Sequence, residues 1–157
     1  MEEIELFIDN TKVTVPSGST ILVAAATLGI NIPTLCYHPD LSLEGACRVC
    51  IVEVDGARNF LPACATRVTS GMQVKTNSPQ IRQARRDIIE LILDNHPKEC
   101  QTCERDGCCE LQNLAYTLGV RERLFEGKRK EHPIETSSAS VVRDANKCIL
   151  CRRCVRV

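Results

Sequence analysis

Four cysteines in the first half of the chain have the spacing of ligands for a small metal cluster. They follow the pattern Cys-x10-Cys-x2-Cys-x13-Cys, at Cys36, Cys47, Cys50 and Cys64. A close pair of thiols with one more distant thiol on each side is the general arrangement of a plant-type [2Fe–2S] site. Tetrahedral zinc uses the same ligands, but zinc ribbons usually bring two short Cys-x2-Cys pairs and this stretch has one. The spacing favours an iron–sulfur cluster, with zinc as the alternative.

A histidine and three cysteines further along form a second group of candidate ligands. Their pattern is His-x3-Cys-x2-Cys-x5-Cys, at His96, Cys100, Cys103 and Cys109. One imidazole and three thiolates from a short loop can hold either a [4Fe–4S] cluster or a single zinc ion. The residues of this loop alone do not separate the two possibilities.

The last three cysteines begin a third pattern and do not complete it. Cys148, Cys151 and Cys154 make two consecutive Cys-x2-Cys steps, as in bacterial ferredoxins, whose run ends in a fourth cysteine followed by proline. The chain stops at Val157, one residue before that cysteine belongs, and contains no Cys-Pro dipeptide. We therefore expect an incomplete [4Fe–4S] site in part of a longer subunit. Completion of the site by a partner chain is the alternative.

Composition narrows the class of protein. Twenty basic residues balance twenty acidic ones among 157, so no net positive charge indicates nucleic-acid binding. The eleven cysteines are odd in number and seven of them form Cys-x2-Cys steps, and the first residues lack the basic region and long apolar run of a signal peptide. These features predict reduced metal ligands in the cytoplasm. No apolar run is long enough for a membrane span, and no nucleotide-binding or catalytic-triad motif indicates a substrate-turnover site.

Alternating apolar residues predict a small mixed sheet with one helix packed on it. We expect a hairpin over residues 3–15 that turns at Asp9-Asn10. A helix over residues 20–28 should start at a Ser19 cap and end at Gly29. A second hairpin is expected over residues 51–61, with a type I′ turn at Asp55-Gly56, and a further strand at residues 72–75.

Helical periodicity predicts a longer helix over residues 79–93, capped by Ser78, and a shorter one over residues 110–118. The apolar stripe expected to pack into the core of the longer helix consists of Ile81, Ala84, Ile88, Leu91 and Ile92. Its arginines are expected largely off that stripe, at Arg82, Arg85 and Arg86. The charged run at residues 121–130 is a candidate docking face, although most such runs are solvated.

Three sequence motifs resemble those of a known family of redox subunits. They are Leu35-Cys36-Tyr37, the stretch Gly45-Ala46-Cys47-Arg48-Val49-Cys50, and Ala63-Cys64. They are similar to the β-grasp [2Fe–2S] domain that begins the large iron–sulfur subunit of respiratory NADH dehydrogenase (complex I), NAD-linked [FeFe]-hydrogenases and NAD-linked formate dehydrogenases. In that family a [4Fe–4S] motif of one histidine and three cysteines follows directly.

The resemblance implies an α+β fold with three parts. Residues 1–78 would form a β-grasp [2Fe–2S] domain, residues 79–136 a small helical [4Fe–4S] domain, and residues 137–157 the incomplete start of a ferredoxin-like domain. It also implies that the first two groups of candidate ligands hold a [2Fe–2S] and a [4Fe–4S] cluster. Cys108 is expected to be a free thiol, and a ligand role for Cys108 in place of Cys109 is the alternative. A further [4Fe–4S] cluster would need a ligand from outside the chain. Because imidazole is neutral, His96 should make its cluster easier to reduce than an all-cysteine one.

The implied function is electron transfer within an NAD(P)-linked oxidoreductase complex. Single electrons would pass between a flavin- and NAD(P)-binding iron–sulfur partner subunit and a terminal site of the hydrogenase or formate dehydrogenase type. The resemblance also allows a small thioredoxin-like [2Fe–2S] subunit as a partner. The alternatives are a respiratory NADH dehydrogenase fragment and a zinc-binding structural or assembly protein. A succinate dehydrogenase or fumarate reductase subunit also begins with such a domain, but His96 argues against it.

Overall fold

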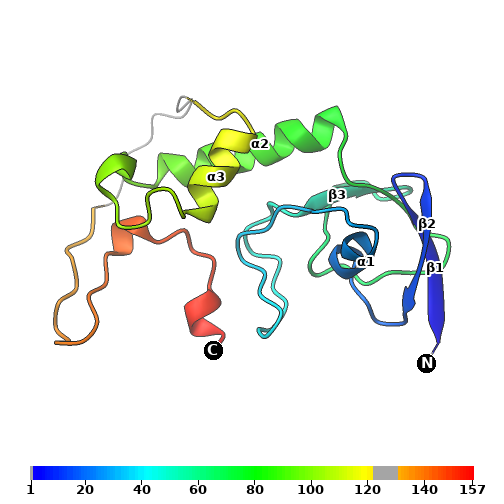
Figure 1. Ribbon diagram of the computed structural model, residues 1–157, viewed down its shortest axis with the longest axis horizontal. Helices are drawn as coiled ribbons and strands as arrows, with labels where there is room; N and C mark the ends of the chain where they lie inside the picture. The colour runs from blue at the N-terminus through cyan, green and yellow to red at the C-terminus, as the bar shows by residue number, and fades with distance from the viewer. Residues whose placement is uncertain (1, 122–130) are drawn as a thin grey trace. The chain divides into compact units, whose positions relative to one another are not determined.

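The computed structural model describes residues 2–121 and 131–157, and its fold is mixed α+β (Figure 1). Contacts divide the chain into two compact units. The first unit comprises Met1–Arg85 together with Arg152–Val157, and the second comprises Arg86–Cys151. The domain boundaries expected at residues 78 and 136 stay predictions.

The first unit is built on a five-stranded sheet. Its strands are β1 (Glu3–Ile8), β2 (Thr11–Pro16), β3 (Ile51–Val54), β4 (Leu61–Pro62) and β5 (Gln73–Lys75). Their order across the sheet is β2-β1-β5-β3-β4, and only the β1–β5 pair is parallel. In that pair Phe7 lies opposite Gln73 and Ile8 opposite Val74. The small mixed sheet expected from the sequence is confirmed.

The first hairpin turns at the predicted dipeptide. Asp9 and Asn10 have φ angles of 47° and 66°, the left-handed pair that a type I′ turn requires. The Asp9 carboxylate then accepts two hydrogen bonds from Thr76, one from the backbone N–H at 2.8 Å and one from the hydroxyl at 2.5 Å. The turn is thereby fastened to the segment that follows β5.

Helix α1 (Ile21–Thr27) packs on this sheet through Ile21, Ala24 and Ala25, which belong to its core (Figure 1). The expected Ser19 cap is wrong, because Thr20 is the N-cap and its hydroxyl accepts from the Val23 N–H at 3.4 Å. Ser19 instead holds a neighbouring segment, since its carbonyl accepts from the Val68 N–H at 3.0 Å. Gly29 follows the helix with a φ of 72°, as predicted.

The second hairpin forms with a different turn from the one expected. Only Gly56 has positive φ, at 82°, and the Ala57 N–H donates to the Val54 carbonyl at 3.0 Å. A left-handed residue at the third position alone is the type II geometry, so the predicted type I′ turn is wrong. The returning strand β4 is also shorter than expected and pairs only where Ile51 faces Pro62 and Val52 faces Leu61.

Helix α2 (Pro79–Asp94) begins at the predicted cap. The Ser78 hydroxyl accepts from the Ile81 N–H at 3.1 Å and donates to Glu53 of β3 at 2.5 Å. The predicted apolar stripe is wrong in part, because Leu91 is 50% exposed and Arg85 only 6%. The buried row is Ile81, Arg85 and Ile89, spaced four residues apart on one helix face. Arg85 is buried there because its guanidinium reaches a backbone carbonyl of β3.

The second unit contains short helices between loops. They are the 3-10 turn η1 (Cys100–Thr102), helix α3 (Glu110–Thr117) and the 3-10 turn η2 (Ala145–Lys147), and the first unit ends in the turn η3 (Arg153–Val155). Gly119, with φ of 68°, follows α3 as predicted. Arg86 of α2 donates to the Gly119 carbonyl at 2.5 Å and pairs with buried Glu90 at 3.3 Å.

No helix in the described part of the chain is long and apolar enough to cross a membrane. The candidate docking run at residues 121–130 lies outside the described residues except for Arg121.

Candidate metal centres

The first group of thiols converges within the first unit. Cys36, Cys50 and Cys64 are each 1% exposed, and Cys47 is half-buried. The hydrogen bond with Cys50 and burial raise the pKa of the Cys64 thiol, and the negative charges of Cys50, Cys36 and Cys47 raise it further. Thiols whose charges act on one another in this way lie near one another, as ligands of a shared cluster must.

At Cys50 and Cys47, hydrogen bonds to the sulfur atom favour the thiolate form that binds metal. The Cys64 thiol donates to Cys50 and, together with the positive charge of Arg85, lowers the pKa of Cys50 to about 6. Burial raises the pKa of Cys47, but the backbone N–H groups of Val49 and Leu35 donate to its sulfur and oppose that shift. Such hydrogen bonds to sulfur are also among the factors that set a cluster's potential.

The backbone of the ligand loop requires unusual conformations. Arg48, between Cys47 and Cys50, has a φ of 59°, and Gly45 has a φ of 63°. A Cβ atom on Gly45 would lie 3.4 Å from the side chains of Ala65 and Pro62. Gly45 therefore lets the loop approach the segment that contains Cys64, which fits the need for backbone close to a cluster.

Two hydrogen bonds hold the backbone beside Cys50. The Cys50 carbonyl accepts from the Ala63 N–H at 3.0 Å, so the β3–β4 pairing continues to the residues just before β3 and just after β4, where Cys50 and Cys64 lie. The next carbonyl, that of Ile51, accepts from the guanidinium of Arg85 at 2.8 Å. The ligand positions are thus fixed by rigid structure on one side of the site.

The segment that ends the first unit contacts the loop around Cys36. Arg156 donates to the carbonyls of Cys36 and Ser42, and Arg153 donates to the carbonyl of Tyr37 at 3.1 Å. Arg152 forms an ion pair of 3.1 Å with Glu44. Sequence reasoning missed these contacts, because no local pattern connects residues 120 positions apart.

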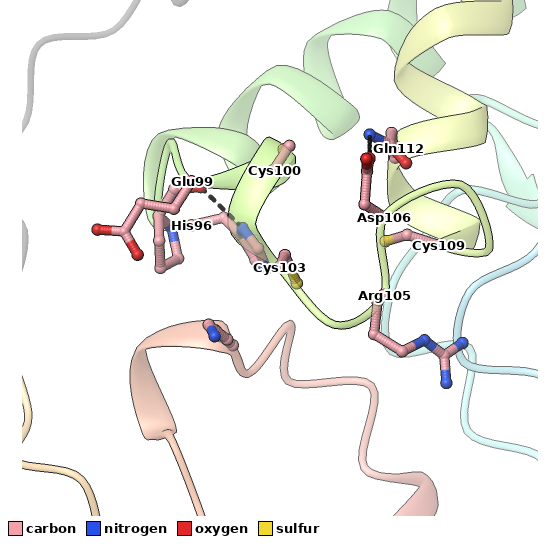
Figure 2. A pocket seen from close by; sticks show the side chains of 10 residues that line it. His96, Glu99, Cys100, Cys103, Arg105, Asp106, Cys109 and Gln112 are labelled. Carbon is pink, nitrogen blue, oxygen red and sulfur yellow. Dashed lines mark hydrogen bonds between the residues drawn. The ribbon is translucent and has the colours of Figure 1, made fainter.

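The second group of candidate ligands lines one pocket of the second unit. The pocket contains His96, Cys100, Cys103 and Cys109, together with Lys147. Cys100 begins η1 and Cys109 is the N-cap of α3, and Figure 2 shows the sulfur atoms of Cys103 and Cys109 on facing sides of the loop. His96 Nδ1 lies 3.2 Å from the Pro97 carbonyl. A proton shared with that carbonyl would leave Nε2 to bind a metal.

Polar contacts brace the loop that contains Cys109. Gln112 of α3 donates to Asp106 at 2.7 Å and accepts from the Gly107 N–H at 3.1 Å (Figure 2). Cys108 is exposed, its thiol lies 3.5 Å from the Arg105 carbonyl, and it does not line the pocket. This arrangement favours Cys109 over its neighbour as the ligand.

The three cysteines of the third group are more exposed to solvent than the thiols of the first group. Cys148 and Cys154 are exposed and Cys151 is half-buried. Leu150 and Arg152, within the two Cys-x2-Cys steps, have φ angles of 54° and 58°, as Arg48 does in the first site. Cys148 and Cys151 belong to the second unit and Cys154 to the first.

The donor sets of the first two groups fit iron–sulfur clusters. Four buried thiols with backbone N–H donors suit a [2Fe–2S] cluster, and three thiols with an imidazole around one pocket suit a [4Fe–4S] cluster. A cluster distributes its ligands over several irons, and in the described ranges no three His, Cys, Asp or Glu side chains form a group that could hold a single metal ion.

Comparison with known families agrees with these donor sets. Residues 1–79 match the model of the 2Fe-2S iron-sulfur cluster binding domain, which is half of the chain. The chain belongs to this family. Residues 85–123 also match the model of the NADH-ubiquinone oxidoreductase-G iron-sulfur binding region. The chain thus has a [2Fe–2S]-binding domain followed by a [4Fe–4S]-binding region, which confirms the resemblance and both cofactors expected from the sequence.

Curated relatives of the chain are subunits of NAD(P)-linked oxidoreductases. It is 50% identical to the NADP-reducing hydrogenase subunit HndD of Solidesulfovibrio fructosivorans, covering 98% of this chain and 27% of that protein. It is 42% identical to the G 2 subunit of NADH-quinone oxidoreductase from Rhizobium meliloti (strain 1021), covering 98% of this chain and 18% of that protein. The chain therefore spans about a quarter or less of the length of these relatives.

A solved structure shares the fold. The chain superposes on a chain of the NAD+-reducing [NiFe]-hydrogenase in the H2-reduced state, with a TM-score of 0.90 and 34% sequence identity. The match covers 98% of this chain and 64% of that one. The five-stranded sheet and the small helical region that follows it are thus the iron–sulfur architecture of this group of oxidoreductases.

Proposed function

We propose that this chain is an electron-transfer module of an NAD(P)-linked oxidoreductase complex. It relays single electrons between a flavin-containing, NAD(P)H-oxidising partner subunit and a terminal redox site of the hydrogenase or formate dehydrogenase type. One-electron transfer is the chemistry that iron–sulfur clusters supply when bound. The observation that carries the proposal is the convergence of four thiols around Cys64 in a domain of the matching family.

Cys36, Cys47, Cys50 and Cys64 bind the [2Fe–2S] cluster in this proposal. Burial of three of these thiols keeps water from the cluster, and the N–H groups of Val49 and Leu35 stabilise negative charge on Cys47. The sheet order and single helix support a β-grasp domain over residues 1–78. No substrate-turnover site is proposed within this chain.

His96, Cys100, Cys103 and Cys109 bind the [4Fe–4S] cluster, with His96 acting through Nε2. Their shared pocket and the Pro97 carbonyl beside Nδ1 support this assignment. The helical domain that holds the cluster spans residues 79–136. A ferredoxin-like domain begins at residue 137, and Cys148, Cys151 and Cys154 are three ligands of a further [4Fe–4S] cluster completed by a residue outside this chain.

Metal and sulfide analysis of the anaerobically purified chain tests the cofactors. We expect about six irons and six sulfides per chain, with one [2Fe–2S] and one [4Fe–4S] signal in low-temperature EPR after reduction. About ten irons would mean that the third site is completed as well. Zinc without sulfide would contradict the electron-transfer function and favour a zinc-binding structural or assembly protein.

A respiratory NADH dehydrogenase is the second candidate parent, because a 42%-identical relative is a subunit of NADH-quinone oxidoreductase. The higher identity to a hydrogenase subunit favours the first candidate. Purification of the native complex through a tag on this chain separates the two. We expect a flavin-containing partner, with a small [2Fe–2S] subunit among the candidates, and NAD(P)-linked hydrogen or formate turnover. Quinone-linked NADH oxidation without either activity would favour the respiratory parent.

A further inference from the structure

Arg85 is a buried cation without a carboxylate partner among the described residues. Its side chain belongs to the core-facing row of α2, and the residue is 6% exposed. Nη2 donates to the Ile51 carbonyl at 2.8 Å. Nε is buried and has no hydrogen-bond partner in the described part of the chain. One neutral carbonyl does not neutralise a guanidinium, which stays protonated in proteins.

The other two arginines of α2, in contrast, are more exposed and contact polar side chains. Arg82 is exposed and donates to the side chain of Asn77 at 3.1 Å. Arg86 pairs with Glu90 at 3.3 Å. Burying an uncompensated charge is strongly unfavourable, so a buried guanidinium implies a negative charge close to it. For Arg85 that charge has to come from something other than a carboxylate.

The ionisable group that adjoins the Arg85 contact is the thiol of Cys50, a candidate ligand of the first site. Ile51, whose carbonyl Arg85 holds, directly follows Cys50 in the chain. Cys50 is 1% exposed and Arg85 is 6% exposed, so water screens the charges of these two residues only weakly. Four thiolates around two irons give a cluster with net negative charge in both oxidation states. Reduction adds one more unit of negative charge.

We propose that Arg85 is the internal counter-charge of the [2Fe–2S] site and raises its reduction potential. The proposal builds on the ligand assignment given above. A fixed positive charge stabilises the reduced cluster more than the oxidised one, because the reduced cluster has the larger negative charge. Since Arg85 is buried, added salt should screen this effect little. Arg85 is a positioning residue here, because it acts on the ligands and takes no part in electron transfer itself.

Potentiometric titration of the full chain, followed by EPR of the [2Fe–2S] signal, tests the proposal. Arg85→Gln keeps a hydrogen-bond donor but removes the charge, and we expect its reduction equilibrium to fall about tenfold, or about 59 mV for one electron. Arg85→Lys keeps the charge and should shift by less than half as much. Arg82→Gln removes an exposed charge from the same helix and should leave the potential unchanged.

Three results would overturn the proposal: an unchanged potential in Arg85→Gln, an equal fall in Arg85→Lys and Arg85→Gln, or loss of the cluster in both. The last would show a purely structural role. If only Arg85→Gln fails to bind its cluster, Arg85→Met is titrated against the same tenfold expectation. If that variant also lacks the cluster, a loaded Arg85→Lys whose potential falls by less than about 30 mV, half the shift expected for loss of the charge, supports the proposal, and a larger fall overturns it. Absence of a [2Fe–2S] signal in the wild-type chain would instead refute the ligand assignment.

Discussion

Arg156 donates a hydrogen bond to the backbone carbonyl of Cys36, a residue 120 positions earlier in the sequence. Its other guanidinium nitrogens contact the carbonyls of Ser42 and Arg152, and its side chain is 6% exposed. The guanidinium of Arg156 thus connects the loop around Cys36, the first candidate [2Fe–2S] ligand, to the segment that follows Cys154.

Replacement of Arg156 by alanine should loosen the Cys36 loop. The change removes several charge-assisted hydrogen bonds, of which the one to the Cys36 carbonyl is partly buried, so we expect a loss of about 1.5–3 kcal/mol in the free energy of unfolding. Chemical denaturation of the full chain measures the loss, and bleaching in air should show faster release of the [2Fe–2S] cluster. Arg152→Ala is the matched control, because the Arg152 side chain is 61% exposed and its ion pair with Glu44 is worth under about 1 kcal/mol. Equal losses in the two variants would contradict the role given to Arg156.

Gly45→Ala should destabilise the first site through both conformation and crowding. The left-handed backbone at φ of 63° costs an alanine about 1–2 kcal/mol, and the new methyl group would press on Ala65 and Pro62. Gly56→Ala serves as the control, since Gly56 has a φ of 82° and no atom lies within 4 Å of the position that an added methyl group would occupy. Thermal unfolding should therefore show a larger loss for Gly45→Ala, accompanied by lower [2Fe–2S] occupancy. A larger loss for Gly56→Ala would argue against close approach at Gly45.

Cys108 and Cys109 should differ in their effect on the [4Fe–4S] cluster. Cys109→Ser removes a thiol that lines the pocket, so iron content should fall by about four per chain and the [4Fe–4S] EPR signal should disappear. Cys108→Ser changes an exposed thiol outside the pocket and should retain both. The opposite pattern would assign the ligand role to Cys108.

His96→Cys should lower the reduction potential of the [4Fe–4S] cluster. A thiolate in place of a neutral imidazole makes the cluster one charge more negative, so an added electron is less favourable. Redox titration followed by EPR measures the shift, and the [2Fe–2S] potential in the same sample is the reference. An unchanged [4Fe–4S] potential would show that His96 is not a ligand.

Local patterns were enough to predict most elements of the fold. Apolar alternation located β1 and β2, and the Asp9-Asn10 pair located their turn, because a hairpin needs only neighbouring residues. The Ser78 cap and Gly119 placed the start of α2 and the end of α3 for the same reason. The candidate ligands followed from cysteine spacing, which metal geometry restricts strongly.

The errors arose where tertiary contacts override local preference. Ser19 and Thr20 are both good caps, and the backbone at the start of α1 is held by distant partners, among them Val68, which donates to the Ser19 carbonyl, and Thr66, which accepts from the Ile21 N–H. Arg85 was expected off the core face from the helical spacing of the apolar residues, but its guanidinium donates to the Ile51 carbonyl of β3, a partner that no local pattern predicts. The contacts of Arg153 and Arg156 with the loop around Cys36 join segments that are far apart in the sequence. No local pattern predicts such contacts.

The parallel pairing of β1 with β5 has a consequence for the order of folding. All four thiols of the first site lie in the stretch between these strands, whereas the β1–β2 hairpin is local and complete before that stretch begins. Pairing across a long intervening segment is slow, because the entropy of closing the loop must be lost before the contacts form. During synthesis the thiols of this stretch therefore leave the ribosome before the strand that encloses them. Iron and sulfide that arrive at that moment would meet an open chain, so maturation of this site should follow the completion of β5.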